Sequence, residues 1–162
     1  MGGTMADDNT NEFRVERAIT IAAPPEFVFR HLTDFHQWVD WSPWEGMDPD
    51  MVRTYSGPDT GVGATYEWKG SRKVGSGRME IVDADAPNEL GIKLDFIKPF
   101  KAQNRTVFTL VPDGEHTAVT WTMTGPKTIL SKIMGIFVSM DTFVGKDFDK
   151  GLAQMKATIE AE

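Results

Sequence analysis

Cysteine is absent from the 162 residues of this chain. The absence excludes a disulfide framework, a thiolate metal site and a cysteine nucleophile, and it fits a reducing cytoplasm. Long apolar runs are absent too, because none approaches the roughly 18 residues that a membrane-spanning helix needs. The N-terminus is acidic and polar, unlike a signal peptide. We therefore expect a cytoplasmic protein without integral membrane association.

Positive charge is scarce, since 17 Lys and Arg residues face 24 Asp and Glu residues, for a net charge of −7. No basic stripe is available to neutralise phosphates, so nucleic acid is not an expected partner. The three histidines, His31, His36 and His116, are scattered, and capping or surface positions suit them. No set of His, Asp and Glu has the spacing of metal ligands, so we expect no metal and no other cofactor.

The length suits one domain, which at this size buries about 70% of the surface of its unfolded chain. Residues 1–11 are polar and acidic, which predicts a disordered leader or residues added for expression. Residues 12–162 contain no repeat, low-complexity tract or internal linker. We therefore predict a single domain over residues 12–162.

The most strongly patterned stretch is the C-terminal one, for which we predict a helix over residues 128–161. Burying eight apolar side chains there contributes roughly 12–24 kcal/mol, at about 1.5–3 each. Ordering some thirty residues costs roughly 1–2 kcal/mol apiece, so the helix needs a large apolar partner surface. The apolar stripe, at spacings of four or three, consists of Ile133, Phe137, Met140, Val144, Phe148, Leu152, Met155 and Ile159.

Two positions on or near this stripe are not explained by packing alone. Gly151 lies on the stripe, where the missing side chain lets a backbone or a ligand approach closely. Asp141 falls within about 40° of the centre of the stripe. Either its side chain leans to the edge of the helix and reaches water, or it faces the buried side, where a carboxylate is a candidate proton carrier.

Upstream of this helix, turn residues separate segments that alternate with the period of strands. Pro24 and Pro25 open a short helix after the first strand. A second short helix or helical turn is expected from residue 35, and Ser42 and Pro43 should end it. No helix-length gap separates the later strands, so they should form an antiparallel meander in which Arg78 and Arg105 point outward. The predicted strands are 13–22, 51–56, 64–70, 75–83, 88–97, 101–111 and 117–124.

Aromatic residues recur at every third position in one segment, as Phe35, Trp38, Trp41 and Trp44. One interpretation is an aromatic plug that closes one end of the sheet. The other is that at least one ring, and Trp44 above all, lines the mouth of a pocket.

The order of strand, two short helices, six strands and long helix is that of the α+β helix-grip fold, in which a curved antiparallel sheet wraps around the C-terminal helix. Five segments carry a closer resemblance: WVDWSPWEGMDPDM, YSGPDTGVGATYEWKG, GSGRMEIVDADAPNELGIKLDFIKPF, FTLVPDGEHTAVTWTMTG and MDTFVGKDFDKGLAQMK. Together they resemble the START-like SRPBCC superfamily and, within it, the polyketide cyclase/dehydratase-like branch. The resemblance extends over nearly the whole chain and implies one START-like ligand-binding domain at residues 12–162.

The resemblance implies a cavity between the concave sheet face and the long helix, which is either open or filled by aromatic side chains. Parity and helical phase then select the residues that could contact a ligand. They are Trp44, Tyr66, Trp68, Met79, Leu94, Phe96, Asn104, Thr106, Phe108, Trp121, Met123, Phe137, Met140 and Asp141.

Two main hypotheses about function follow from the resemblance. The first is a non-catalytic carrier or sensor of a small hydrophobic or amphipathic, lipid- or polyketide-like molecule. The alternative is a polyketide cyclase/dehydratase-type enzyme, for which the Asp141 carboxylate and the Tyr66 phenol are candidate proton-transfer groups. A co-chaperone or interaction module of the same fold is a third possibility, and either a monomer or a homodimer is compatible with the sequence.

Overall fold

The computed structural model describes residues 12–71, 74–98, 101–126 and 140–162, together with all their side chains except those of residues 140–143. The predicted leader, residues 1–11, lies outside the described residues. The elements are β1 (Glu12–Ile21), α2 (Pro25–Leu32), the 3₁₀ helix η1 (Phe35–Asp40), β2 (Val52–Ser56), β3 (Thr65–Lys69), β4 (Ser76–Asp85), β5 (Glu89–Lys98), β6 (Ala102–Asp113), β7 (His116–Pro126) and α4 (Met140–Glu160).

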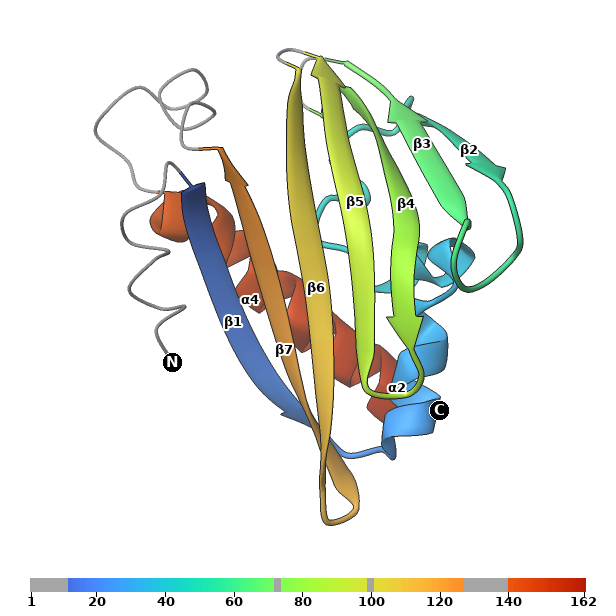
Figure 1. Ribbon diagram of the computed structural model, residues 1–162, viewed down its shortest axis with the longest axis vertical. Coiled ribbons are helices and arrows are strands. Elements are labelled where there is room, and N and C mark those ends of the chain that lie inside the picture. Colours follow the sequence, from blue (N-terminus) through green and yellow to red (C-terminus); the bar gives the residue numbers. More distant parts are fainter. Residues whose placement is uncertain (1–11, 72–73, 99–100, 127–139) are drawn as a thin grey trace.

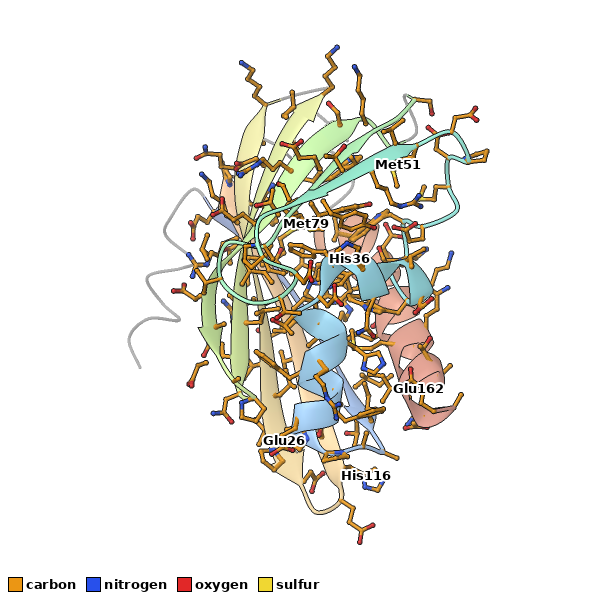
Figure 2. The ribbon with its side chains drawn as sticks, turned by 90° about the vertical axis from the view of Figure 1, so that its right-hand side faces the viewer. Glu26, His36, Met51, Met79, His116 and Glu162 are labelled. Carbon is orange, nitrogen blue, oxygen red and sulfur yellow. The ribbon has the colours of Figure 1, made fainter. Side chains whose placement is uncertain are left out.

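The seven strands form one antiparallel sheet in the order β1-β7-β6-β5-β4-β3-β2. Figure 1 shows α4 crossing one face of the curved sheet, and Figure 2 shows α2, η1 and α4 on the same side of it. The other face carries no described helix. This arrangement confirms the predicted α+β helix-grip fold.

Proline sets the boundaries of both short helices. Pro24 is extended and Pro25 occupies the first turn of α2, as predicted, because proline needs no hydrogen-bond partner there. The 3₁₀ helix ends at Asp40, shortly before Ser42 and Pro43, the residues that were expected to end it. Proline disfavours a helical conformation in the residue before it, here Ser42.

The apolar stripe of the long helix is buried wherever the structure describes its side chains. Val144, Phe148, Leu152, Met155 and Ile159 are all nearly inaccessible to solvent. Ile133 and Phe137 lie outside the described residues, as does the side chain of Met140. The predicted start of the helix at residue 128 therefore stays a prediction.

Gly151 allows two rings of the protein itself to approach α4. A Cβ atom added at Gly151 would lie 2.8 Å from Cδ of Pro43 and 3.1 Å from Cζ3 of Trp121. Both distances are shorter than an ordinary van der Waals contact. The sequence predicted that a backbone or a ligand would approach closely at Gly151, and in the structure the rings of Pro43 and Trp121 do so.

An aromatic cluster lies between η1, the sheet and α4. The rings of Trp38 and Trp41 have centroids 4.6 Å apart, and Phe108 lies 5.8 Å from Trp38 and 6.0 Å from Trp41. Trp121 stacks on Phe148 of α4, with 3.9 Å between centroids and 6° between planes. Trp38 and Trp41 therefore form the aromatic plug, and their edge-to-face contacts add to the stability that burial provides.

His31 is buried, in contrast to the surface or capping position expected from the sequence. Its Nδ1 lies 3.0 Å from the carbonyl oxygen of Phe27, and its Nε2 lies 2.9 Å from Oε2 of Glu162. Both partners are hydrogen-bond acceptors. The imidazole thus connects α2 to Glu162, two residues beyond the C-terminal end of α4.

Candidate functional site

The antiparallel register aligns the residues of the concave sheet face into rows that run across the strands. The first row contains Arg53, Trp68, Gly77, Phe96 and Ala102, and the second contains Tyr55, Tyr66, Met79, Leu94 and Asn104. We call these the two open rows. The third row contains Ile81, Ile92, Thr106, Met123 and Val15, and the fourth contains Leu90, Phe108, Trp121 and Arg17. We call these the two closed rows.

Burial decreases from the closed rows to the open rows, although Tyr66, Gly77 and Asn104 of the open rows are buried as well. Every side chain of the closed rows is buried except that of Arg17, which is half-buried. In the open rows the large apolar side chains of Trp68, Met79, Leu94 and Phe96 are only half-buried. The aromatic cluster and the stripe of α4 cover the closed rows, so the concave face is filled over one part and accessible over the other. The open rows form the candidate functional site.

A fixed tryptophan provides much of the apolar surface of the open rows. Nε1 of Trp68 donates a hydrogen bond to the carbonyl oxygen of Val74 at 2.8 Å, which sets the orientation of the ring. The indole lies over Gly77, where an added Cβ would overlap with it. Phe96 meets Trp68 edge to face at 6.0 Å. This part of the site is therefore apolar and preorganised.

A charged pair borders the open rows at the edge strand β2. The Arg53 guanidinium donates hydrogen bonds to the carboxylate of Glu45, which comes from the segment after η1. The hydrogen bond that Arg53 donates to Glu45 is the main reason why the pKa of Arg53 is raised. Both side chains are mostly shielded from solvent, so the pair brings charge to the margin of an apolar surface.

Two phenols lie beside this charged pair. The rings of Tyr55 and Tyr66 are 5.3 Å apart, and Tyr66 is 7% exposed. Burial raises the pKa of Tyr66 well above its ordinary value, and the neighbouring Glu45 carboxylate adds to this effect. Burial also raises the pKa of Tyr55. At neutral pH, Tyr66 is consequently a neutral phenol that can donate a hydrogen bond but is a poor base.

Asn104 is the most unusual residue of the open rows. Asn104 is 5% exposed. In the part of the chain that the structure describes, neither its amide nitrogen nor its amide oxygen has a hydrogen-bond partner. The amide oxygen lies against Gly125 of β7, where a Cβ would overlap with it. A buried amide without a partner costs about 1–3 kcal/mol. Folding alone therefore does not explain an asparagine at this position.

The raised pKa values lead to a prediction for alkaline titration. Tyr55 and Tyr66 are the only two tyrosines of the chain. An ordinary tyrosine is half ionised at about pH 10, so we expect phenolate absorbance to show less than one ionised tyrosine per chain at that pH. Because the folded state holds these protons more tightly than the unfolded state, stability should fall as the pH rises above about 10. Unfolding the protein in urea should restore an ordinary titration curve, and a native curve identical to the unfolded one would contradict the prediction.

The structure brings together six of the residues that the sequence suggested as ligand contacts: Tyr66, Trp68, Met79, Leu94, Phe96 and Asn104. It places Thr106, Phe108, Trp121 and Met123 in the closed rows. Trp44 is half-buried beside Trp121, with 6.1 Å between the ring centroids. Phe137 lies outside the described residues, and Met140 and Asp141 are placed in α4 without a described side chain. The roles of all these residues in ligand binding stay predictions.

Sequence reasoning missed Glu45, Arg53 and Tyr55. A signal for the last two was present, because they alternate with the exposed Val52 and Thr54 along β2. No comparable pattern marks Glu45, which lies in an irregular segment and reaches Arg53 only in the folded chain.

Other polar groups lie away from this site. Arg78 pairs with Glu67 at 3.5 Å and with Glu80 at 3.1 Å, and Arg105 pairs with Asp83, so both arginines face outward as predicted. Across the described ranges, no three His, Asp or Glu side chains are grouped as metal ligands would be. Within the same ranges, no helix has the length and apolarity needed to cross a membrane.

A curved sheet that holds a C-terminal helix, with an accessible apolar area on its concave face, defines a hydrophobic ligand-binding fold. The model of the family described as polyketide cyclase/dehydrase and lipid transport matches residues 12–160, so the chain belongs to this SRPBCC-type family. No curated protein matches the chain.

Solved structures share the fold at low sequence identity. CV1439 from Chromobacterium violaceum is 18% identical, with a TM-score of 0.64 over 93% of this chain and 97% of that one. DynU16, from the dynemicin biosynthetic locus, is 15% identical, with a TM-score of 0.62 over 91% of this chain and 47% of that one. Ara h 8.0201 is 9% identical, with a TM-score of 0.64 over 93% of this chain and 99% of that one. At these identities the likeness concerns the fold alone.

Proposed function

We propose that this protein binds a small amphipathic molecule in the open rows of the concave face and acts as its carrier or sensor. The observation that carries the proposal is Asn104, whose buried amide has no partner in the described residues although it lies next to half-buried Leu94. Buried polar groups are nearly always hydrogen-bonded in folded proteins. A ligand with a polar head and an apolar body would provide the missing partner.

The surroundings of Asn104 support this division of the ligand into head and body. Trp68, Met79, Leu94 and Phe96 offer an apolar surface without a charge, which suits an alkyl or ring system. The neutral phenol of Tyr66 and the guanidinium of Arg53 can donate hydrogen bonds at the other margin. The raised pKa of Tyr66 keeps this phenol protonated at neutral pH, so it can donate a hydrogen bond to the head of a ligand but is a poor general base.

The substitution Asn104→Leu tests the proposal through two readouts that should move in opposite directions. Removing an unsatisfied amide should raise the free energy of unfolding by about 1–3 kcal/mol. Wild-type protein should bind a medium-chain alcohol more tightly than the alkane of equal length, by about fivefold in affinity for one hydrogen bond. The variant should bind the two probes with equal affinity. Tryptophan fluorescence during titration measures the binding, and urea unfolding measures the stability.

Gln103→Leu is the matched control, because Gln103 carries an amide on the exposed outer face of the same strand. This control should leave the preference for the alcohol unchanged. The proposal fails if neither probe perturbs the fluorescence of the wild-type protein. It also fails if Asn104→Leu lowers stability and keeps the preference, because the amide would then have a purely structural role.

One observation favours the enzymatic alternative, a cyclase- or dehydratase-type reaction on a polyketide-like substrate. Tyr66, Arg53 and Glu45 gather at one margin of the open rows, where a phenol and a guanidinium could polarise a carbonyl group. Similarity to DynU16, from the dynemicin biosynthetic locus, is compatible with this alternative but concerns the fold. Asp141 is a second candidate, one turn before Gly145 on α4.

Turnover separates the two functions. On the enzymatic alternative, Tyr66→Phe or Asp141→Asn should abolish conversion of a poly-β-ketone thioester while the ligand still binds. On the carrier proposal, wild-type protein leaves such a thioester unchanged, and the substitutions alter only its affinity. Product analysis by mass spectrometry next to a protein-free control decides between them.

A further inference from the structure

The two ends of the sheet carry opposite charge. Figure 1 shows β3 and β5 ending, and β4 and β6 beginning, at the upper end of the sheet, with the β4–β5 and β6–β7 turns at the lower end. Three exposed lysines, Lys69, Lys98 and Lys101, lie at the upper end, which we call the Lys98 end. Four exposed acidic residues, Asp85, Glu89, Asp113 and Glu115, lie at the other end. Figure 2 places Glu26 and Glu162 toward this acidic end as well.

The lysines of the Lys98 end are available for a partner. Within the ranges that the structure describes, none of the three takes part in an ion pair. Glu67, the acidic residue nearest to them on β3, is paired with Arg78 at 3.5 Å. Asp48, in the segment before β2, is 8% exposed, and its Oδ2 accepts a hydrogen bond from the backbone N–H of Ser71 at 2.6 Å. The Lys98 end is therefore locally positive although the chain has a net charge of −7.

Apolar side chains accompany these lysines on the outer face of the sheet. Val52 is 60% exposed and Ile97 is 47% exposed. Val52, Lys69, Ser76 and Lys98 follow one another across β2, β3, β4 and β5 in register. They border a hollow of about 1020 Å³ that Ile97 also lines. A surface on which lysines lie next to exposed aliphatic side chains has a composition typical of surfaces that bind at a membrane interface.

We propose that the Lys98 end is a docking surface for an anionic phospholipid bilayer. The lysines would contact lipid phosphate and carboxylate groups, and Ile97 and Val52 would enter the boundary between headgroups and acyl chains. Trp68 and Gly77 line the outer hollow and also belong to the first open row. The docked end would therefore adjoin the open rows, but the proposal does not depend on whether a ligand binds there.

The acidic end does not prevent this orientation. The 12 residues of β6 extend over roughly 40 Å at about 3.4 Å per residue. The Debye length at physiological ionic strength is about 8 Å, so the acidic groups are screened from a bilayer that touches the opposite end. The separation of charge along the molecule would orient an approaching protein with its lysines toward the anionic surface.

Sedimentation with vesicles tests the proposal on the wild-type full chain. Vesicles of phosphatidylcholine with phosphatidylserine should bind the protein at low salt, and vesicles of phosphatidylcholine alone should not. The double variant Lys69→Gln with Lys98→Gln should weaken this binding by about 20- to 30-fold, on the order of fivefold for each lysine. Ile97→Ser should also weaken it, by about tenfold.

Matched controls remove equal charge or apolar area elsewhere. Lys146→Gln with Lys150→Gln changes two exposed lysines of α4, and Val111→Ser changes a side chain that is 53% exposed on β6. Both should bind the vesicles as wild type does. The proposal is overturned if wild-type protein ignores the anionic vesicles at low salt, or if the controls lose as much binding as the test variants. It is also overturned if Ile97→Ser instead abolishes self-association in sedimentation velocity, which would identify a second copy as the occupant.

Discussion

Phe108→Ala should lower the free energy of unfolding by about 3–5 kcal/mol, the usual cost of emptying a phenylalanine site in a packed core. Phe108 is 0% exposed and lies 5.8 Å from Trp38, 6.0 Å from Trp41 and 5.0 Å from Trp121, measured between ring centroids. The surrounding rings are held by η1, β7 and α4, so they cannot collapse into the space. For a domain with a stability of about 5–15 kcal/mol, this loss is a large fraction of the total.

Urea unfolding followed by circular dichroism measures the loss for Phe108→Ala, with Val62→Ala as control because Val62 is 58% exposed. The control should change stability by less than about 0.5 kcal/mol. The result also tests the boundary of the candidate site. A loss below about 1 kcal/mol at Phe108 would mean that the closed rows are loosely packed, and it would return Phe108 to the group of ligand contacts that the sequence suggested.

Arg53→Met should be the second most destabilising change, with a loss of about 1–3 kcal/mol. The substitution keeps the aliphatic stem of the side chain but leaves the Glu45 carboxylate, which is only 14% exposed, without its partner. Removing one member of a fully buried pair costs about 3–5 kcal/mol. The expected loss is smaller here because the Arg53 side chain is 30% exposed and water screens the pair.

A double-mutant cycle isolates the interaction between Arg53 and Glu45. If the unpaired carboxylate causes the loss, Glu45→Gln combined with Arg53→Met should recover most of the stability. Chemical denaturation of the wild type, both single variants and the double variant provides the four free energies. Losses that simply add would show that the pair does not hold the segment after η1 against β2.

The pattern of the sequence was sufficient to predict most of the fold. Strand limits agree within a few residues because alternation and turn residues are local signals, as in β5, predicted over 88–97 and observed at Glu89–Lys98. The opening of α2 by Pro25 is likewise local. The 3₁₀ helix also lies where the sequence predicted it, and it ends at Asp40, shortly before Ser42 and Pro43, which were expected to end it.

The candidate site could be predicted only in part. Parity correctly assigned Tyr66, Met79, Leu94 and Asn104 to one face, because successive strand residues point to opposite sides. Parity could not separate the open rows from the closed rows, since both have the same alternation. Sequence reasoning therefore grouped Phe108 with Leu94, whereas the structure buries the first completely and leaves the second half-exposed.

The sequence by itself determined which residues form strands and helices, which side of each strand is apolar, and that an amphipathic C-terminal helix must lie against the sheet. Only the tertiary structure decided where that helix and the aromatic plug stop covering the concave face, that Glu45 reaches Arg53, and that the Asn104 amide is left without a partner among the described residues. Local propensity and periodicity depend on residues a few positions apart, so they can be read directly from the sequence. The lining of a site depends on contacts between segments far apart in the chain, whose relative placement is set by the packing of the whole domain.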